Sequence, residues 1–234
     1  GLLLSLSVFS AKPASNPIPN SNDTTNILSL FKKMNVFLYV GTKSAPFSLK
    51  DSLKNTYKFR PTPQTRMGVG FVSKWFGIRL GFVLPNSREN ESKYGKTTSL
   101  DLQSNIFAKN FGLDLYYLKY KGFYLENPSS IIPSWTSSTP YPHNRDLSRS
   151  TYGGNFFYIF NHKNSSQKAA FQQIEWQKKS SGSFMAGTYF NVTTVDSDST
   201  LIDIRDYNTI KHLDLKHVKS TTGGVSIGYS QNFI

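Results

Sequence analysis

Apolar and polar side chains alternate along several segments of the chain, which is the two-residue period of β-strands. Residues 66–74 and 77–84 flank the short stretch "KWFG", and we predict a hairpin with Trp75 and Phe76 as its turn. One face of this hairpin is apolar and consists of Met67, Val69, Phe71, Ile78, Leu80, Phe82 and Leu84. The other face is small or charged and consists of Arg66, Gly68, Gly70, Lys74, Gly77, Arg79 and Gly81.

A second hairpin is predicted around "KNFG", between residues 99–109 and 112–125, with Asn110 and Phe111 as the turn. Its apolar face consists of Leu100, Leu102, Ile106, Ala108, Leu113, Leu115 and Tyr117. Its other face consists of Asp101, Gln103, Asn105, Phe107, Asp114, Tyr116 and Tyr120. Alternation of this kind fits a soluble β-sandwich or lipocalin-like binder, whose apolar face lies in the core, and equally a membrane barrel, whose apolar face contacts lipid.

Two features favour the membrane barrel. Aromatic residues cluster at the ends of the predicted strands, as in the interfacial girdles of membrane barrels. These predicted membrane-interface residues are Trp75, Phe76, Phe111, Phe123 and Tyr124. In addition, the tight turns alternate with long polar loops at 51–56, 85–96 and 126–149, which is typical of barrels with short turns at one rim and long loops at the other.

Five further strands are predicted, at residues 36–49, 152–161, 167–177, 183–195 and 222–233, and the first strand of the first hairpin is extended to 57–74. The total is nine, whereas single-chain bacterial barrels have an even number of strands. We therefore predict an all-β fold, an antiparallel up-and-down transmembrane β-barrel of about 10 to 12 strands when complete, with this chain truncated at both ends. A tenth strand within 201–215 is an alternative.

The N-terminal segment divides into two parts. Residues 1–11, "GLLLSLSVFSA", resemble the end of a secretory signal peptide, with a short buried strand as the alternative. Residues 12–34 form a polar lead-in, and 35–234 form the barrel domain. The longest apolar run ends at Lys12, so no stretch of about 20 apolar residues could form a membrane helix.

The formal net charge of +13 is compatible with nucleic acid, anionic lipid or an anion-selective lumen as a partner. The basic residues are dispersed, and no RNA-binding or zinc-finger motif is present, so nucleic acid is not expected. Lys119 and Lys121 lie on the apolar parity near the long-loop end, where their side chains could reach lipopolysaccharide phosphates. Outer-membrane lipid and lipopolysaccharide are therefore the expected partners, with protein partners in an envelope complex as a further expectation.

Four stretches together resemble an uncharacterised Bacteroidota family of outer-membrane barrels, domain-of-unknown-function family 4421. They are "KYGKTTSLDLQ", "GLDLYYLKYKGFYL", "YIFNHKNSSQKAAFQQIEWQKKSSGSF" and "GGVSIGYS". The resemblance covers about residue 35 to the C-terminus and implies the outer membrane of a Gram-negative (Bacteroidota) bacterium. Members of the family continue beyond the last residue of this chain, and the family brings no known activity or catalytic residues.

No arrangement of residues indicates catalysis or a cofactor. The polar residues predicted to line the lumen, where they would form ion pairs and hydrogen bonds, are Arg66, Arg79, Asp101, Gln103, Asn105 and Asp114. His212 and His217 are five residues apart with Asp214 between them, but no third ligand is fixed, so no metal site is expected. No G-x-S-x-G elbow occurs, and Ser and Thr are too frequent for one near a histidine to be informative.

We therefore expect a non-enzymatic integral outer-membrane protein, most simply a structural or accessory component of a cell-envelope assembly. A small anion-preferring pore is the first alternative, because Arg66, Lys74 and Arg79 share the predicted lumenal face. An outer-membrane hydrolase or acyltransferase is the second. It would require a serine within hydrogen-bond reach of His143, His162, His212 or His217.

Overall fold

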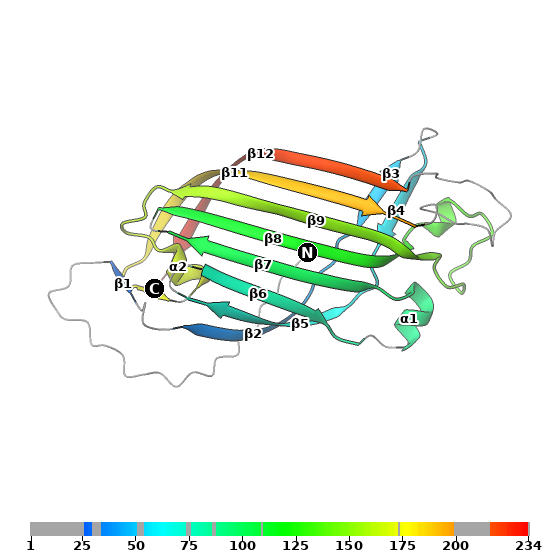
Figure 1. Ribbon diagram of the computed structural model, residues 1–234, viewed down its shortest axis with the longest axis horizontal. Coiled ribbons are helices and arrows are strands. Elements are labelled where there is room, and N and C mark those ends of the chain that lie inside the picture. The colour runs from blue at the N-terminus through cyan, green and yellow to red at the C-terminus, as the bar shows by residue number, and fades with distance from the viewer. Residues whose placement is uncertain are drawn as a thin grey trace.

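The chain forms a curved antiparallel β-sheet, seen in a computed structural model that describes residues 26–29, 34–50, 54–73, 76–85, 88–108, 110–172, 174–198 and 216–233 (Figure 1). Of the ten strands in this sheet, eight lie side by side in sequence order. They are β2 (Asn35–Thr42), β5 (Thr65–Val72), β6 (Phe76–Val83), β7 (Thr98–Phe107), β8 (Phe111–Leu125), β9 (His143–Ile159), β11 (Ser181–Asp196) and β12 (His217–Asn232). The fold is all-β, as predicted. In the part of the chain that the structure describes, β2 and β12 are the two edges of an open sheet.

Two predicted long strands are each interrupted by proline. The predicted strand 36–49 is β2 followed by β3 (Phe47–Lys50), which begins directly after Pro46. The predicted strand 57–74 is β4 (Thr56–Arg60) and β5, separated by a segment that contains Pro61 and Pro63. Proline has no N–H to donate, so it ends the ladder. As a result β3 and β4 pair with each other, and β4 also pairs with β8, so that they form a separate ribbon at one end of the sheet (Figure 1).

The segment 167–177 is not a barrel strand, and this prediction is wrong. Its first half is the short helix α2 (Gln167–Phe171), and its second half, β10 (Glu175–Gln177), pairs with β1 (Ile27–Ser29) in a separate two-stranded sheet. Ser166 caps the helix, because its hydroxyl accepts a hydrogen bond from the Ala169 N–H at 3.0 Å. A capping serine and alanines favour a helix over a strand.

Both predicted hairpins have the right faces but the wrong register. Val72 lies opposite Gly77, whereas the predicted turn would have placed it opposite Arg79. Likewise Asp101 lies opposite Leu118 rather than Tyr120. In each hairpin the turn comes one residue earlier than predicted, which moves the pairing by two residues. A shift of two leaves every side chain on the same face, because the side-chain period of a strand is two.

Regular structure also occurs within two predicted loops. The loop 85–96 contains the helix α1 (Arg88–Tyr94), which ends at Gly95, a residue with φ of +77° whose N–H donates to the Glu91 carbonyl. Strand β9 begins at His143, inside the predicted loop 126–149, because its first residues pair with the end of β8. The alternative tenth strand, within 201–215, lies outside the described residues.

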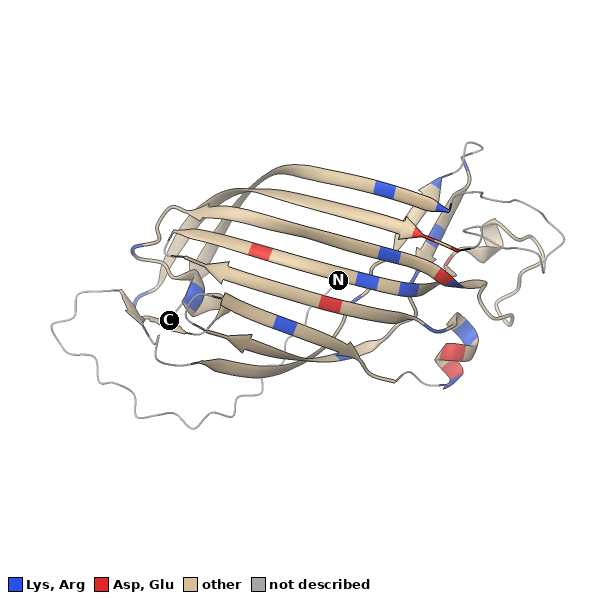
Figure 2. Ribbon diagram, in the orientation of Figure 1, with Lys and Arg blue, Asp and Glu red and all other residues tan. Residues whose placement is uncertain are grey.

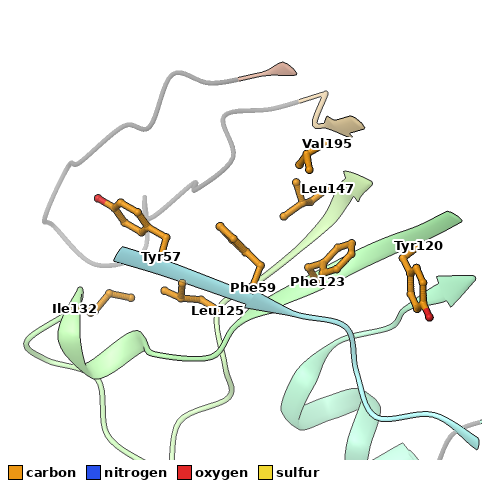
Figure 3. Packing of buried hydrophobic residues seen from close by; sticks show 8 residues of the cluster. All are labelled: Tyr57, Phe59, Tyr120, Phe123, Leu125, Ile132, Leu147 and Val195. Carbon is orange, nitrogen blue, oxygen red and sulfur yellow. The ribbon is translucent and has the colours of Figure 1, made fainter. Parts of the chain in front are cut away.

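The main hydrophobic core lies where the ribbon β3–β4 packs on the sheet, at the end that carries α1 (Figures 1 and 3). The buried members of this cluster are Tyr57, Phe59, Tyr120, Phe123, Leu125, Ile132, Leu147 and Val195. Helix α2 covers the opposite end, and its Phe171 ring stacks on Phe107. We call the face that holds the ribbon and α2 the covered face, and the other the apolar face. The two ends are the α1 end and the α2 end.

Candidate functional site: the polar covered face

A charged cluster occupies the middle of the covered face. The Asp101 carboxylate is 2.8 Å from Lys43 Nζ and 3.2 Å from Arg66 Nη1. Arg66 also donates to the Ser99 hydroxyl at 2.6 Å, and the Gln103 amide donates to Asp101 at 2.9 Å. Asp101 is 6% exposed and Arg66 is 5% exposed. Buried charges of this kind are stable only when they are paired and hydrogen-bonded, and here both carboxylate oxygens are occupied.

A second cluster of polar side chains lies closer to the α2 end. Arg79 donates to the Asn105 side-chain oxygen at 2.9 Å, and the Asn105 amide donates to Asp114 at 2.6 Å. Asn105 and Asp114 face each other across β7 and β8, and Asn155 of β9 lies next in the same row. Asp101 and Asp114 therefore belong to separate groups with separate partners, and they do not form an acid/base dyad.

A cavity of about 460 Å³ lies beside this second group, between the sheet and α2. One glycine makes room for it, because Gly228 lies on the wall and a Cβ there would meet only the Met185 methyl, at 3.8 Å. Two acceptor oxygens that are buried and lack a hydrogen-bond partner belong to lining residues, Asn155 Oδ1 and Gln167 Oε1. The other polar lining side chains are Arg79, Asn105, Asp114 and Ser226, and the aromatic ones are Phe107, Phe157 and Phe171.

Helix α2 is held over the cavity by hydrogen bonds from both of its ends. The Gln167 amide donates to the Ser230 hydroxyl of β12 at 2.5 Å, and the Gln172 amide donates to the Asn105 carbonyl at 3.4 Å. Asn232 of β12 donates to the Ser166 carbonyl at 3.0 Å. The helix therefore connects the edge strand β12 to the central strand β7.

The structure brings together all six residues predicted to line the lumen: Arg66, Arg79, Asp101, Gln103, Asn105 and Asp114 share the covered face. Sequence reasoning missed Lys43, Asn155 and Gln167. Asn155 could have been found, because it has the covered-face parity within a predicted strand. Lys43 could have been found in the same way, because the predicted strand 36–49 contains it with the parity opposite to Val36 and Leu38. Gln167 carried no signal, since it was assigned to a strand that the structure does not have.

The predicted interface aromatics divide into two groups. Phe76 and Phe111 lie on the apolar face at the α2 end, with 40% and 38% of their surface exposed. Phe123 and Tyr124 are buried, which differs from the prediction. A bulge at Gly122 breaks the β8–β9 pairing between Lys121 and Phe123 and directs Phe123 into the core, whereas Tyr124 packs against the rings of Tyr94 and Tyr141. Trp75 lies outside the described residues.

Lys119 and Lys121 are exposed on the apolar face of β8, toward the α1 end and beyond its last apolar residue, Tyr117. Lys121 is 3.6 Å from the Asp146 carboxylate, and both side chains are about half exposed. Such a surface ion pair contributes little to stability. Figure 2 shows the wider pattern, in which charged residues are sparse along the strands and more frequent toward the α1 end.

The described histidines do not form a catalytic or metal-binding group. The hydrogen bonds of His143 and His162 go to the carbonyls of Tyr141 and Ile159, and that of His217 goes to the Asp196 carboxylate at 2.6 Å. Their partners are thus not serine hydroxyls. Among the residues that the structure describes, no three His, Cys, Asp or Glu side chains are grouped as metal ligands would be. His212 and Asp214 lie outside those residues.

Within the described part of the chain, no helix has the length and apolar character needed to cross a lipid bilayer.

Comparison with known proteins gives one match. The family described as a domain of unknown function, DUF4421, matches residues 21–234. No curated protein and no solved structure matches the chain. Because the family match covers nearly the whole chain, the chain belongs to the DUF4421 family.

Proposed function

We propose that the chain is an integral β-barrel of the outer membrane of a Gram-negative (Bacteroidota) bacterium, with a structural or accessory role in the cell envelope. The observation that carries the proposal is the distribution of polarity between the two faces. The covered face holds the charged and polar groups, whereas the opposite face is apolar and uncovered. A soluble β-protein has the reverse arrangement, with its apolar side chains in the core.

The apolar face extends over all eight strands of the main path. Many of its large apolar side chains are between 38% and 85% exposed. They include Val36, Leu38, Val40, Met67, Val69, Ile78, Phe82, Leu100, Leu102, Ile106, Phe111, Leu115, Tyr152, Phe156, Phe184, Phe190, Val225, Ile227 and Tyr229. Soluble monomers rarely expose a contiguous apolar patch of more than a few hundred Å². A lipid environment would turn this unfavourable surface into a favourable one.

The apolar residues form a band that crosses the strands obliquely. One row of paired residues runs from Leu38 on β2 to Thr221 on β12. The border of the band that faces the α1 end can be located on both edge strands. On β2 it lies at Val40, two residues from the row toward the α1 end. On β12 it lies at Val225, four residues from the row toward the α2 end. The border therefore shifts by six residues, about 20 Å, across seven strand spacings, about 34 Å.

This shift means that the strands are inclined by about 30° to the normal of the band. Strands in membrane barrels are tilted by about 35–45° from the membrane normal, so an apolar band that is level in the bilayer must run obliquely across their pairing register. The oblique band thus supports a bilayer as the solvent of this face.

The packing at the α1 end favours a structural role over an open pore. Phe59, Phe123 and Leu147 are each at most 3% exposed under the ribbon β3–β4. Among the described residues, this packed layer fills the space beneath the ribbon β3–β4. The partners found for the described histidines give a hydrolase no support, and the expected absence of an enzymatic role stays a prediction.

The experiment that tests the membrane assignment compares two arginine substitutions on β5. Val69 lies in the middle of the apolar band and is 43% exposed, while Thr65 lies on the same face, four residues away and outside the band. Val69→Arg should lower the free energy of unfolding in phospholipid vesicles by about 2–4 kcal/mol, because arginine at the bilayer centre is costly. Thr65→Arg, the matched control, should cost under about 1 kcal/mol.

An exposed surface in water predicts a different result, since a new arginine there would be tolerated at both positions. Equal stability of the two variants, together with folding in detergent-free buffer, would contradict the membrane assignment.

For the accessory role, mild crosslinking in outer-membrane fractions should capture a specific protein neighbour of a heat-modifiable band. A protein that migrates alone and conducts ions freely in planar bilayers would instead indicate the pore.

A further inference from the structure

The cavity at the α2 end has the features of a small-molecule site, which goes beyond the structural role proposed above. It lies on the covered face, with a volume of about 460 Å³, within the range of about 300–1,000 Å³ that ligand pockets occupy. Its walls combine aromatic rings with a small number of polar groups, which is the usual composition of such pockets. Three properties of the walls define the ligand.

The first property is a set of acceptors that lack donors. Gln167 is only 3% exposed, and its Oε1 has no hydrogen-bond partner. Asn155 Oδ1, on strand β9, likewise has no hydrogen-bond partner. A buried polar atom without a partner costs about 1–3 kcal/mol, and native proteins seldom leave one unsatisfied. Both residues line the cavity, and although the two oxygens are themselves enclosed by protein, rotation of either amide group would direct it toward a ligand with several hydrogen-bond donors.

The second property is that the charges on the cavity wall cancel. The cavity wall carries one cation, Arg79, and one anion, Asp114, which are connected through Asn105 rather than paired directly. The wall as a whole is therefore neutral, and a ligand with a net charge would bury that charge without a counterion. A neutral ligand that both donates and accepts hydrogen bonds matches this wall. Hydroxyl groups do both.

The third property is the aromatic part of the wall. Phe107 and Phe171 lie parallel, with an angle of 3° between their planes, and Phe157 meets Phe107 edge to face at 6.1 Å. Phe171 lines the cavity and is also 60% exposed to solvent, so its ring lies at the mouth of the cavity. Such rings bind the C–H faces of a ring-shaped ligand whose hydroxyl groups point sideways to polar side chains.

We propose that the cavity binds a neutral, hydroxyl-rich ring molecule, a saccharide of one or two sugar units. The orphaned amide oxygens and Asp114 accept from its hydroxyl groups, Arg79 donates to its oxygens, and the phenylalanine rings contact its C–H face. Gln167 and Phe171 both come from α2, so the helix supplies a polar contact and a hydrophobic contact to the same ligand.

A glycine pair on β12 provides a matched test. Gly228 lies on the cavity wall, where a Cβ would have open space, so Gly228→Phe should fill the cavity without a backbone clash. Gly223 lies on the same strand with the opposite parity, away from the cavity, and a Cβ there would be 3.5 Å from the Tyr189 carbonyl. Gly223→Phe is therefore the control for added bulk on this edge strand.

The binding probes are glucose, N-acetylglucosamine, cellobiose and chitobiose, titrated calorimetrically into the full chain in lauryldimethylamine oxide micelles, since maltoside and glucoside detergents carry competing sugars. At least one probe should bind, Gly228→Phe should weaken it at least tenfold, and Gly223→Phe should leave it within twofold. Asn155→Leu should also weaken binding at least tenfold without lowering the melting temperature, because leucine removes the orphaned oxygen at similar volume.

Three outcomes would overturn the proposal. The first is that none of the four sugars binds at concentrations up to about 10 mM. The second is that glycine and alanine, tested as zwitterions, bind in place of the sugars. The third is that binding survives in Gly228→Phe. The Val69 and Thr65 variants test the membrane assignment independently of these results.

Discussion

The two ends of the covered face are built on the same strands, yet one is closely packed and the other contains a cavity. At the α1 end the ribbon β3–β4 brings Phe47, Tyr57 and Phe59 onto the sheet, where they pack against other buried apolar side chains. At the α2 end a helix of five residues leaves a cavity whose walls contain unsatisfied amide oxygens. The strands alternate in the same way at both ends, so the covering element makes the difference.

This contrast assigns stability of the fold to one end and ligand binding to the other. A closely packed apolar layer contributes most of the stability that a small core can supply, and it has no room for a ligand. A cavity with polar walls contributes little to stability, and the cost of its unpaired groups is offset when a ligand binds. We therefore expect substitutions at the α1 end to act on folding and those at the α2 end to act on binding.

The largest expected effect is a loss of stability at the α1 end. Leu147 is 0% exposed, so Leu147→Ala should lower the free energy of unfolding by about 2–5 kcal/mol through lost burial and the void that remains. Phe171→Ala is the corresponding truncation to alanine at the α2 end, and because this ring is 60% exposed it should cost under about 1 kcal/mol. Urea unfolding in vesicles measures both, and equal losses would remove the contrast between the ends.

A smaller effect is expected from two glycines. Gly122 has φ of +92°, and a Cβ would lie 2.1 Å from the Lys96 carbonyl oxygen, so Gly122→Ala should cost about 1–3 kcal/mol. Gly228→Ala at the α2 end meets only the Met185 methyl at 3.8 Å and should change stability by under about 0.5 kcal/mol. The same unfolding measurement applies. A harmless Gly122→Ala would mean that the bulge in β8 can relax.

The smallest effect concerns Tyr124, which lies at the α1 end of β8, beyond the apolar band. Burial raises the pKa of Tyr124 to about 12, although the nearby Arg60 opposes the shift. A raised pKa means that the fold favours the neutral phenol. This contribution is complete below the unfolded pKa of about 10 and is lost as the pH rises toward 12.

The check is a difference titration of the phenolate absorbance between the parent chain and Tyr124→Phe. The step that disappears in the variant should have its midpoint near pH 12. A midpoint near 10 would show that water reaches the α1 end, and the two ends would then differ less than the packing indicates.

The predicted faces and the observed register illustrate what a one-dimensional pattern can and cannot specify. Alternation assigned Asp101, Asn105 and Asp114 to one face, and the structure places them there. The same alternation misplaced the turn in both hairpins, because the pattern is unchanged when a strand slides by two residues. Register depends on the turn and on cross-strand contacts, and these are properties of the folded chain.

The remaining errors arose where local sequence and tertiary contacts compete. The start of β9 is polar, and it is a strand because it pairs with β8 and buries Leu147. Phe123 and Tyr124 have the composition of an interfacial girdle, but a bulge at Gly122 directs Phe123 into the core, and Tyr124 packs against Tyr94 and Tyr141. A bulge in the middle of a strand leaves no clear mark on an alternating pattern.

The sequence by itself determined the all-β class, the division of each hairpin into an apolar and a polar face, and membership of the family, because these follow from side-chain identity and a period of two. Only the tertiary structure decided which elements cover the polar face. The ribbon β3–β4 and the helix α2 are placed by contacts between residues far apart in the chain, such as Arg149 with the Ala45 carbonyl and Gln167 with Ser230. Long-range contacts of this kind depend on shape and closure, which no local period records.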